Sequence, residues 1–440
     1  MLARRFRVME TRPSAGVSSS LCLMGRRSDS QMPIDFARIP PRIPVPAPPQ
    51  LSKPVWLVLL GVVQCLGAAL TIFLWPKGRP TNTVWFWFCV VGYPMLAWAF
   101  LLCCRLGYLY ARRSGAIAAN RVSDHETEKC HALASEPLAL LGHAWCFSSD
   151  HDENGIEGLV DGSLVLRPRA SRAEPNTDVS ARWLEIRDQQ FHAGNELTEH
   201  ARHQAVCNWL LVRLIDSLAP QLMALPVRTT LQIESVLEDT DVRALLQQLV
   251  SAKSPSLRVT MTPPPAPSSV FQADAWFDRM RPQVVHLLVA VRLRNAVSER
   301  LQDGVAEAGV ALLLAHPSLA KTMTGNPPLR LHRPARGPGD AVGETLEHAM
   351  RWGKAALTRV KTVWSHGLSP ELEVAIKSAS QLDGQRSKID LKTTVGDCGA
   401  AGGWLATALA AELAERTGDP QLVLTPDGGD LIALVCRKQT

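Results

Sequence analysis

Two long apolar segments, residues 55–74 and 84–104, dominate the hydrophobic pattern near the start of this 440-residue chain. The first contains one strongly polar residue, Gln64, and the second contains no charged residue. A helix of about 20 apolar residues crosses a hydrocarbon core of ~30 Å, so each segment is long enough to span a membrane. The short connection between them includes Pro76 and Pro80, which favour a turn over a continued helix. The pattern therefore predicts a transmembrane hairpin over residues 55–104.

Basic residues flank this hairpin unequally. Only Lys77 and Arg79 lie in the connecting turn. The other flanks contain Arg38, Arg42, Lys53, Arg105, Arg112, Arg113 and Arg121. Because basic residues concentrate in the cytoplasmic flanks of membrane proteins, we expect both termini in the cytoplasm and the protein in the inner (plasma) membrane. The alternative, two buried helices of a soluble protein, fits tandem segments of this length poorly.

Beyond the hairpin the pattern changes from a helical connector to alternating helices and strands. Residues 105–134 have few helix breakers and predict a linker helix. Residues 199–222 have apolar positions at three- and four-residue spacing, as in an amphipathic helix. Strands are expected near residues 229–233, 257–262, 284–293, 309–315, 360–364, 389–394, 421–425 and 431–437. This alternation predicts a layered α/β domain over residues 135–440.

The formal net charge of +6 comes entirely from residues 1–54, which carry nine Lys and Arg against three acidic residues. The rest of the chain is balanced, with 38 residues of each sign. A basic tail beside a membrane span is typical of attraction to anionic lipid, and we find no nucleic-acid motif. We therefore expect a lipid bilayer, and not nucleic acid, as a partner. The tail is also rich in proline and is expected to be disordered.

Four short motifs follow one another in the C-terminal third. They are Asp303-Gly304-Val305-Ala306, His366-Gly367, Lys392-Thr393-Thr394-Val395-Gly396 with Gly399-Ala400-Ala401-Gly402, and Asp427-Gly428-Gly429. Their order and spacing over about residues 285–440 resemble the second half of the condensing-enzyme family, the thiolase fold of the β-ketoacyl synthases. The resemblance implies an internally duplicated α/β domain, with halves at about residues 135–280 and 285–440.

The sequence departs from that family at the residues that carry out catalysis. The resemblance implies a Cys nucleophile in the first half and two His residues that stabilise the thioester oxyanion. His366 and Lys392 match the family, but Asp397-Cys398 stands where the second His is expected, and no thiol can be matched to the nucleophile. We therefore expect no catalytic residues, no metal and no cofactor.

The hypothesis we favour from the sequence is a membrane-anchored, catalytically degenerate ketosynthase-like protein that acts as a scaffold or adaptor. Such proteins are similar to the accessory components of type VI secretion effector clusters. The resemblance thus makes secretion-system or effector proteins candidate partners.

Two other hypotheses use different residues. The first is an active acyltransferase or condensing enzyme that uses Cys207 or Cys398 on acyl thioesters at the inner membrane. The neighbours of Cys207 include no activating base, and Cys398 adjoins a carboxylate. The second is a metal-binding membrane regulator. Its ligands would come from His125, Cys130, His131, His143, Cys146 and His151, whose spacing is poor for a single ion.

Overall fold

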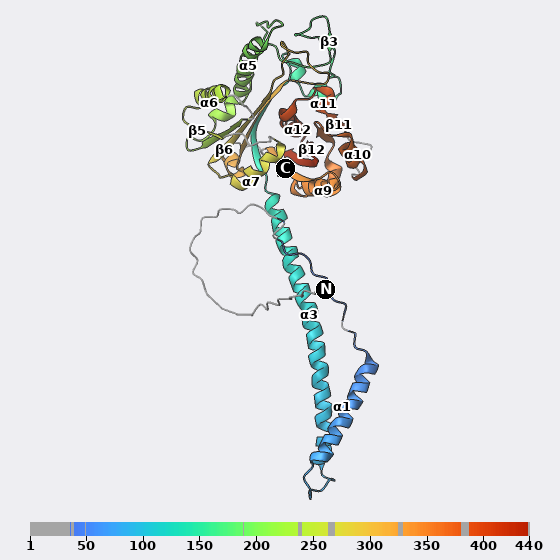
Figure 1. The fold of residues 1–440 in the computed structure, drawn as a ribbon. Helices are drawn as coiled ribbons and strands as arrows, with labels where there is room; N and C mark the ends of the chain where they lie inside the picture. The colour runs from blue at the N-terminus through green and yellow to red at the C-terminus, as the bar shows by residue number, and fades with distance from the viewer. Residues whose placement is uncertain are drawn as a thin grey trace, which may run out of the picture. The chain divides into compact units, whose positions relative to one another are not determined.

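The computed structural model describes Phe36 and residues 39–48, 50–187, 189–235, 240–262, 269–323, 329–379 and 387–438. Two of its helices are long and apolar enough to cross a membrane. One is α1 (Lys53–Leu74). The other is a continuous run made of α2 (Val84–Trp87), a π-helical turn (Phe88–Gly92) and α3 (Tyr93–Ala134). The predicted linker helix is therefore the second half of α3 (Figure 1).

Gln64, the one strongly polar residue of the first apolar segment, lies against the π-helical turn. Its Nε2 is 3.3 Å from the carbonyl oxygen of Val90 and 3.4 Å from that of Val91. The turn bonds five residues back, as from Tyr93 N to Phe88 O, and Pro94 has no N–H to continue this pattern, so Gln64 brings a side-chain donor to a turn that lacks one main-chain donor. Beside this contact Gly67 gives room for the ring of Pro94, since a Cβ on Gly67 would lie 2.1 Å from Pro94 Cγ.

The α/β domain contains one 11-stranded mixed sheet made of two sets of strands. The first set is β1 (Leu138–Cys146), β4 (Thr230–Ser235), β5 (Arg258–Thr262), β6 (Val284–Arg292) and β7 (Ala308–Ala315). The second set is β8 (Leu329–Leu331) with β9 (Ala335–Pro338), then β10 (Thr362–Ser365), β11 (Ser387–Asp390), β12 (Gln421–Asp427) and β13 (Asp430–Lys438).

The two sets have the same internal order. The first reads β5-β4-β6-β7-β1 and the second β11-β10-β12-β13-β8, which is third, second, fourth, fifth and first strand in each case. In both sets the fifth strand is antiparallel to its two neighbours, and the second, third and fourth strands pair in parallel. An antiparallel pairing of β1 with β8 joins the sets. The domain is therefore internally duplicated.

Helices cover the sheet on both faces (Figure 1). The buried helix α12 (Gly402–Thr417) packs on strands of both sets, including β1, β7, β12 and β13. On the other face, α5 (Glu196–Met223) packs on β1 and β7 and against α6 (Thr240–Lys253). The second set is covered there by α9 (Val342–Trp352), which packs against α10 (Pro370–Ala379). The prediction of a layered α/β domain is confirmed.

The sequence-based boundaries need three adjustments. First, β6 and β7 complete the first set of strands, so the repeats meet between residues 315 and 329, and not near residue 285. Second, the strand expected at 389–394 ends at Asp390, whose side chain accepts a hydrogen bond from Lys392 N and begins the short helix α11 (Leu391–Thr394). Third, residues 39–48, part of the tail expected to be disordered, contact α3.

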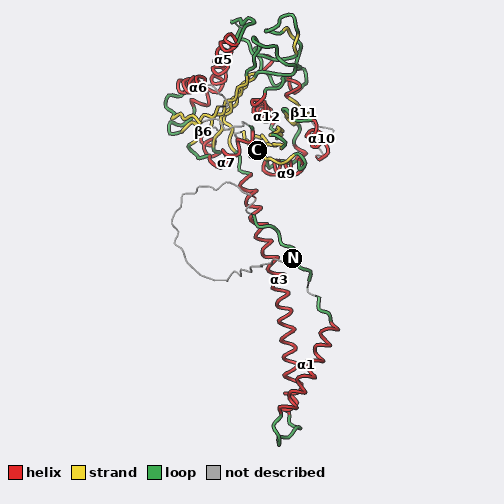
Figure 2. Tube along the Cα trace, viewed as in Figure 1, coloured by secondary structure: helices red, strands yellow, loops and turns green. Residues whose placement is uncertain are grey.

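Figure 2 shows that the chain between β1 and α5 is mostly loop. Its regular structure consists of a 3₁₀ turn (Asp152–Asn154), α4 (Glu157–Val160) and the two-residue strands β2 (Arg169–Ala170) and β3 (Asp178–Val179). This long excursion was not predicted. It supplies the walls of a polar pocket that is described below.

Candidate functional site

The C-terminal motifs meet at the start of α12. His366 follows the last residue of β10, and Asp397 and Cys398 lie just before α12. His366 Nε2 accepts a hydrogen bond from Cys398 N at 3.2 Å and lies 3.6 Å from Asp397 Oδ1. The Asp303–Ala306 motif joins them, because Asp397 N donates to Gly304 O at 2.6 Å. Three of the four C-terminal motifs, although distant in sequence, therefore form one site.

His366 is tightly enclosed in this site. Its side chain is buried, and a Cβ on Gly402 would lie 2.1 Å from its Cε1 atom. Burial lowers the pKa of His366, and the nearby carboxylates of Asp397 and Asp390 only partly oppose this. The ring is therefore neutral at pH 7, and the hydrogen bond from Cys398 N makes Nε2 its unprotonated nitrogen. This nitrogen cannot donate a hydrogen bond to a developing oxyanion.

Asp397 holds the turn together. Its Oδ1 accepts from Gly399 N at 2.8 Å, and its main-chain oxygen accepts from Arg294 at 3.0 Å. The Arg294 guanidinium also lies 3.7 Å from Asp397 Oδ2. Lys392 is exposed. The structure thus places a paired carboxylate beside His366, at the position where the resemblance implied a second imidazole.

The thiols proposed as nucleophiles are buried. Cys398 lies in the core with its Sγ 3.5 Å from Gly396 O, and burial, reinforced by the charge of Asp397, raises its pKa to about 12. Cys207 lies on the buried face of α5 and is 5% exposed. The two thiols belong to different hydrophobic clusters, one on each face of the sheet. The structure therefore does not bring them together.

Sequence reasoning missed a second group near the start of α12. Val270 begins a 3₁₀ turn (Val270–Ala273), and a Cβ on Gly403 would lie 2.6 Å from its Cγ2. The preceding residue, Ser269, has its Oγ 3.4 Å from Asp427 Oδ2, and Arg336 lies 3.1 Å from the same oxygen. The Asp427-Gly428-Gly429 motif thus reaches this group. No sequence signal distinguished Ser269, because it follows a proline-rich stretch of sequence with no recognisable motif.

The histidines and cysteines suggested as metal ligands do not form one group: His125, Cys130 and His131 lie on α3, His143 and Cys146 on β1, and His151 in the turn after β1. His131 is on α3 and accepts a hydrogen bond from Trp352 Nε1, whereas Cys146 is at the end of β1 with Sγ 3.3 Å from Ser148 O. His143 instead lies near Glu412 and Glu415 of α12, the one group with metal-ligand geometry in the part of the chain that is described.

Glu412 already has two partners in this group. His143 Nε2 is 2.9 Å from Glu412 Oε2, and Arg416 Nε is 2.5 Å from Glu412 Oε1. The hydrogen bond with His143, followed by that from Arg416, lowers the pKa of Glu412 to about 2. A guanidinium on the same carboxylate opposes a metal cation, so we interpret the group as an ion-paired contact between β1 and α12.

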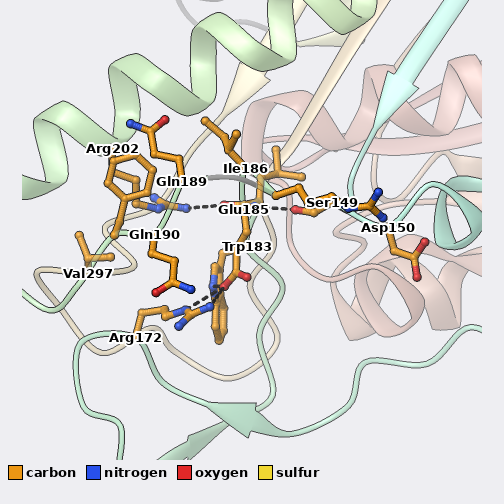
Figure 3. A pocket seen from close by; sticks show the side chains of 13 residues that line it. Ser149, Asp150, Arg172, Trp183, Glu185, Ile186, Gln189, Gln190, Arg202 and Val297 are labelled. Atoms are coloured by element: carbon orange, nitrogen blue, oxygen red, sulfur yellow. Dashed lines mark hydrogen bonds and ion pairs between the residues drawn. The ribbon is translucent and has the colours of Figure 1, made fainter.

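A polar pocket of about 360 Å³ lies between α5 and the loop after β3 (Figure 3). Figure 3 shows Arg172 and Trp183 converging on Glu185, with donor–acceptor distances of 2.8 and 2.7 Å to Glu185 Oε1. Arg202 closes the inner wall and donates to Leu184 O at 3.2 Å and to Glu307 at 2.6 Å. The Arg172 and Arg202 guanidinium groups are thus both paired within the protein.

Among the comparisons with known proteins, only the one with solved structures finds similar proteins, and these include ketosynthases. No protein-family model matches the sequence, and no curated protein matches it. The ishigamide ketosynthase/chain length factor is 15% identical with a TM-score of 0.46, over 69% of this chain and all of that one. A ketosynthase of the bacillaene synthase from Bacillus amyloliquefaciens is 13% identical with a TM-score of 0.46, over 70% and 77% of the two chains.

A third similar structure is a 3-oxoacyl-(acyl carrier protein) synthase III, FabH, from Xanthomonas oryzae. It is 12% identical with a TM-score of 0.42, over 68% of this chain and 98% of that one. These structures belong to the class of condensing enzymes that the sequence resembles. At such identities and TM-scores, the likeness assigns no activity to this chain, and its internal duplication stands on its own strand order.

Proposed function

We propose that this chain is a membrane-anchored, ketosynthase-like protein that binds other proteins as a scaffold or adaptor and transfers no acyl groups. One observation carries the proposal, namely that both candidate thiols are buried. Burial raises the pKa of Cys398 to about 12, so its thiol is protonated at pH 7. Because the thiolate is the nucleophile, a buried and protonated thiol is poorly suited to attack a thioester.

The setting of His366 supports the same proposal. A general base must present a free lone pair to the nucleophile, yet Nε2 of His366 already accepts from Cys398 N. The Asp397 carboxylate beside it would repel the charge of a tetrahedral oxyanion. These groups instead stabilise the turn that leads into α12.

Contacts between the two flanks of the hairpin support the membrane anchor. Pro40 O, before α1, accepts a hydrogen bond from Ser123 on α3, and Arg42 pairs with Asp124 at 2.5 Å. Residues before the first apolar helix thus touch residues after the second. A chain that crosses a bilayer twice returns to the side where it began, so this contact agrees with a hairpin whose two flanks share one side. The choice of the cytoplasmic side rests on the basic residues of those flanks. The proposed partners, secretion-system or effector proteins, rest on the sequence resemblance alone.

The proposal is tested by exposing the full chain, in lipid nanodiscs, to acyl-coenzyme A and acyl-carrier-protein thioesters. We expect no acyl adduct in the intact mass at pH 7. Alkylation after denaturation, which should modify all ten cysteines, verifies that the thiols were chemically competent.

The variants Cys207→Ala and Cys398→Ala identify the residue if an adduct forms. An adduct that disappears in either variant would contradict the proposal and establish the acyltransferase hypothesis. An adduct that survives in both would locate an unassigned nucleophile and contradict the proposal equally.

A further inference from the structure

The segment before α1 lies along the C-terminal part of α3. We call Phe36 and residues 39–48 the arm. The side-chain amide of Asn120 pairs with both main-chain polar groups of Ile43, accepting from its N–H at 2.8 Å and donating to its carbonyl at 2.9 Å. Ser123 donates to Pro40 O at 2.7 Å. These bonds fix the backbone of the arm and do not depend on its side chains.

Four rings meet where the arm reaches the α/β domain. Phe36 stacks near Trp352 and His348 of α9, with ring centroids 6.1 and 6.4 Å apart and interplanar angles of 19° and 20°. Its centroid is 5.0 Å from that of His131 on α3. His348 and Trp352 also stack on each other at 5.6 Å. The arm, α3 and α9 are therefore joined by this ring cluster.

His131 must be neutral to make its hydrogen bond in the ring cluster. Its side chain is buried, and its Nδ1 accepts from Trp352 Nε1 at 3.0 Å. An imidazolium ion donates from both nitrogens, so a protonated His131 cannot accept this bond. The hydrogen bond therefore requires a neutral ring. His131 lies about 40 Å along α3 beyond Cys104, outside the apolar segment.

We propose that the arm is a strap that fastens α9 of the α/β domain to α3 through a neutral His131, and that protonation of His131 releases it. Arg351 and His348 of α9 face this ring and oppose a positive charge, whereas Glu128 of α3 and Glu347 of α9 favour one. Arg351 is already paired with Glu128 at 2.5 Å, so the protonated ring would compete for a carboxylate that has a partner.

The direction of the pH effect follows from these surroundings. Burial, followed by the charges of Arg351 and His348, lowers the pKa of His131 below its ordinary value near 6.5. The fastened state therefore binds fewer protons than the released state. The fastened state has its full stability above about pH 6.5. Below that value the equilibrium constant for fastening falls by up to about tenfold per pH unit, until the lowered pKa of His131 is reached.

Hydrogen exchange of the full chain in nanodiscs, at pH 7.5 and 5.5, tests the strap. The amide of Ile43 reports on the arm because it is bonded to Asn120. After correction for intrinsic exchange, we expect its protection to fall up to about tenfold at pH 5.5. Protection in α12 should fall less than protection in the arm, because the fall in the arm adds to any pH effect of the buried His366 on the domain. Equal protection of the arm at both pH values would overturn the proposal.

Three variants make the test specific. His131→Gln can accept from Trp352 without titrating, so its arm should stay protected at both pH values. His200→Gln, an exposed histidine on α5, should respond like the parent. Phe36→Ala should lower the protection of the arm at both pH values and weaken its pH response, because the arm then loses its contact with the ring cluster but keeps its bonds to Asn120 and Ser123. A parent-like pH response in His131→Gln, or a parent-like arm in Phe36→Ala, would refute the strap. If His131→Gln also loses protection in α12 and is therefore unfolded, Trp352→Phe decides instead: without the N–H donor, protonation of His131 no longer breaks a hydrogen bond, so the fall in arm protection between pH 7.5 and 5.5 should become smaller. An unchanged fall in Trp352→Phe would refute the strap.

Discussion

Arg202 joins two buried carboxylates beside the pocket of the first repeat. Its guanidinium is 2% exposed and donates to Glu199 at 2.9 Å and to Glu307 at 2.6 Å. Both carboxylates also accept main-chain hydrogen bonds, Glu307 from Leu184 N and Glu199 from Val297 N. One buried cation thus holds the loop after β3 and the loop before β7 against α5.

We expect Arg202→Met to destabilise the domain by about 3–5 kcal/mol, because it leaves two buried carboxylates without a counter-ion. Arg172→Met is the matched control, since Arg172 pairs with Glu185 at a site where both side chains are 39–49% exposed. Its cost should be about 0–1 kcal/mol. Chemical denaturation of both variants measures the difference, and similar losses in the two would show that Arg202 is not the connecting group.

At the scale of elements, small and polar residues form the contact between α1 and the helical run from α2 to α3. Besides the Gln64 contacts, Thr71 Oγ1 lies 3.2 Å from Cys89 O in the π-helical turn. Side-chain donors thus reach carbonyls that the π-helical geometry and Pro94 leave without regular partners. The close approach that makes this possible depends on Gly67, which has no Cβ to strike the Pro94 ring.

Gly67→Leu should therefore separate the two helices, whereas Gly61→Leu should not, because nothing lies within 4 Å of a Cβ at Gly61. Oxidative cross-linking between a Thr71→Cys variant and native Cys89 reports their proximity in the full chain in nanodiscs. We expect a high yield in the Gly61→Leu background and a yield reduced severalfold in the Gly67→Leu background. Equal yields would mean that the glycine does not set the helix spacing.

At the scale of the whole molecule, the duplicated domain and the hairpin imply different constraints on the chain. The repeats require strand pairings that span the domain, such as β1 with β8. The proposed membrane hairpin would require only that residues 75–83 lie on one side of the bilayer and the arm and domain on the other. The arm contacts α3, the helix that leads from the apolar segment to the domain.

Reporter fusions after Gly78 and after Thr440 test the topology. Alkaline phosphatase should be active only at Gly78 and a fluorescent protein that folds in the cytoplasm only at Thr440, because the flanks with most basic residues stay inside. A fusion after Pro48 serves as the control and should behave like Thr440. The same compartment for Gly78 and Thr440 would exclude the hairpin.

Much of the architecture was predictable because its signals are local. The apolar segments, the helix at α5 and most strands are visible in periodicity over ten to twenty residues. The four C-terminal motifs were found because small residues and His366 occur in a recognisable order. The motif residues could therefore be identified in the sequence, and the structure brings His366, Asp397 and Cys398 together.

Tertiary structure alone decided what these residues can do. The burial of Cys398, the acceptor role of His366 Nε2 and the pairing of His131 with Trp352 each depend on elements far apart in the chain. The repeat boundary likewise became visible only through strand order, since β6 and β7 look like any apolar strands until their partners are known. Sequence determines which segments are apolar and how they are spaced, but the pKa and accessibility of a side chain are set by whatever packs against it.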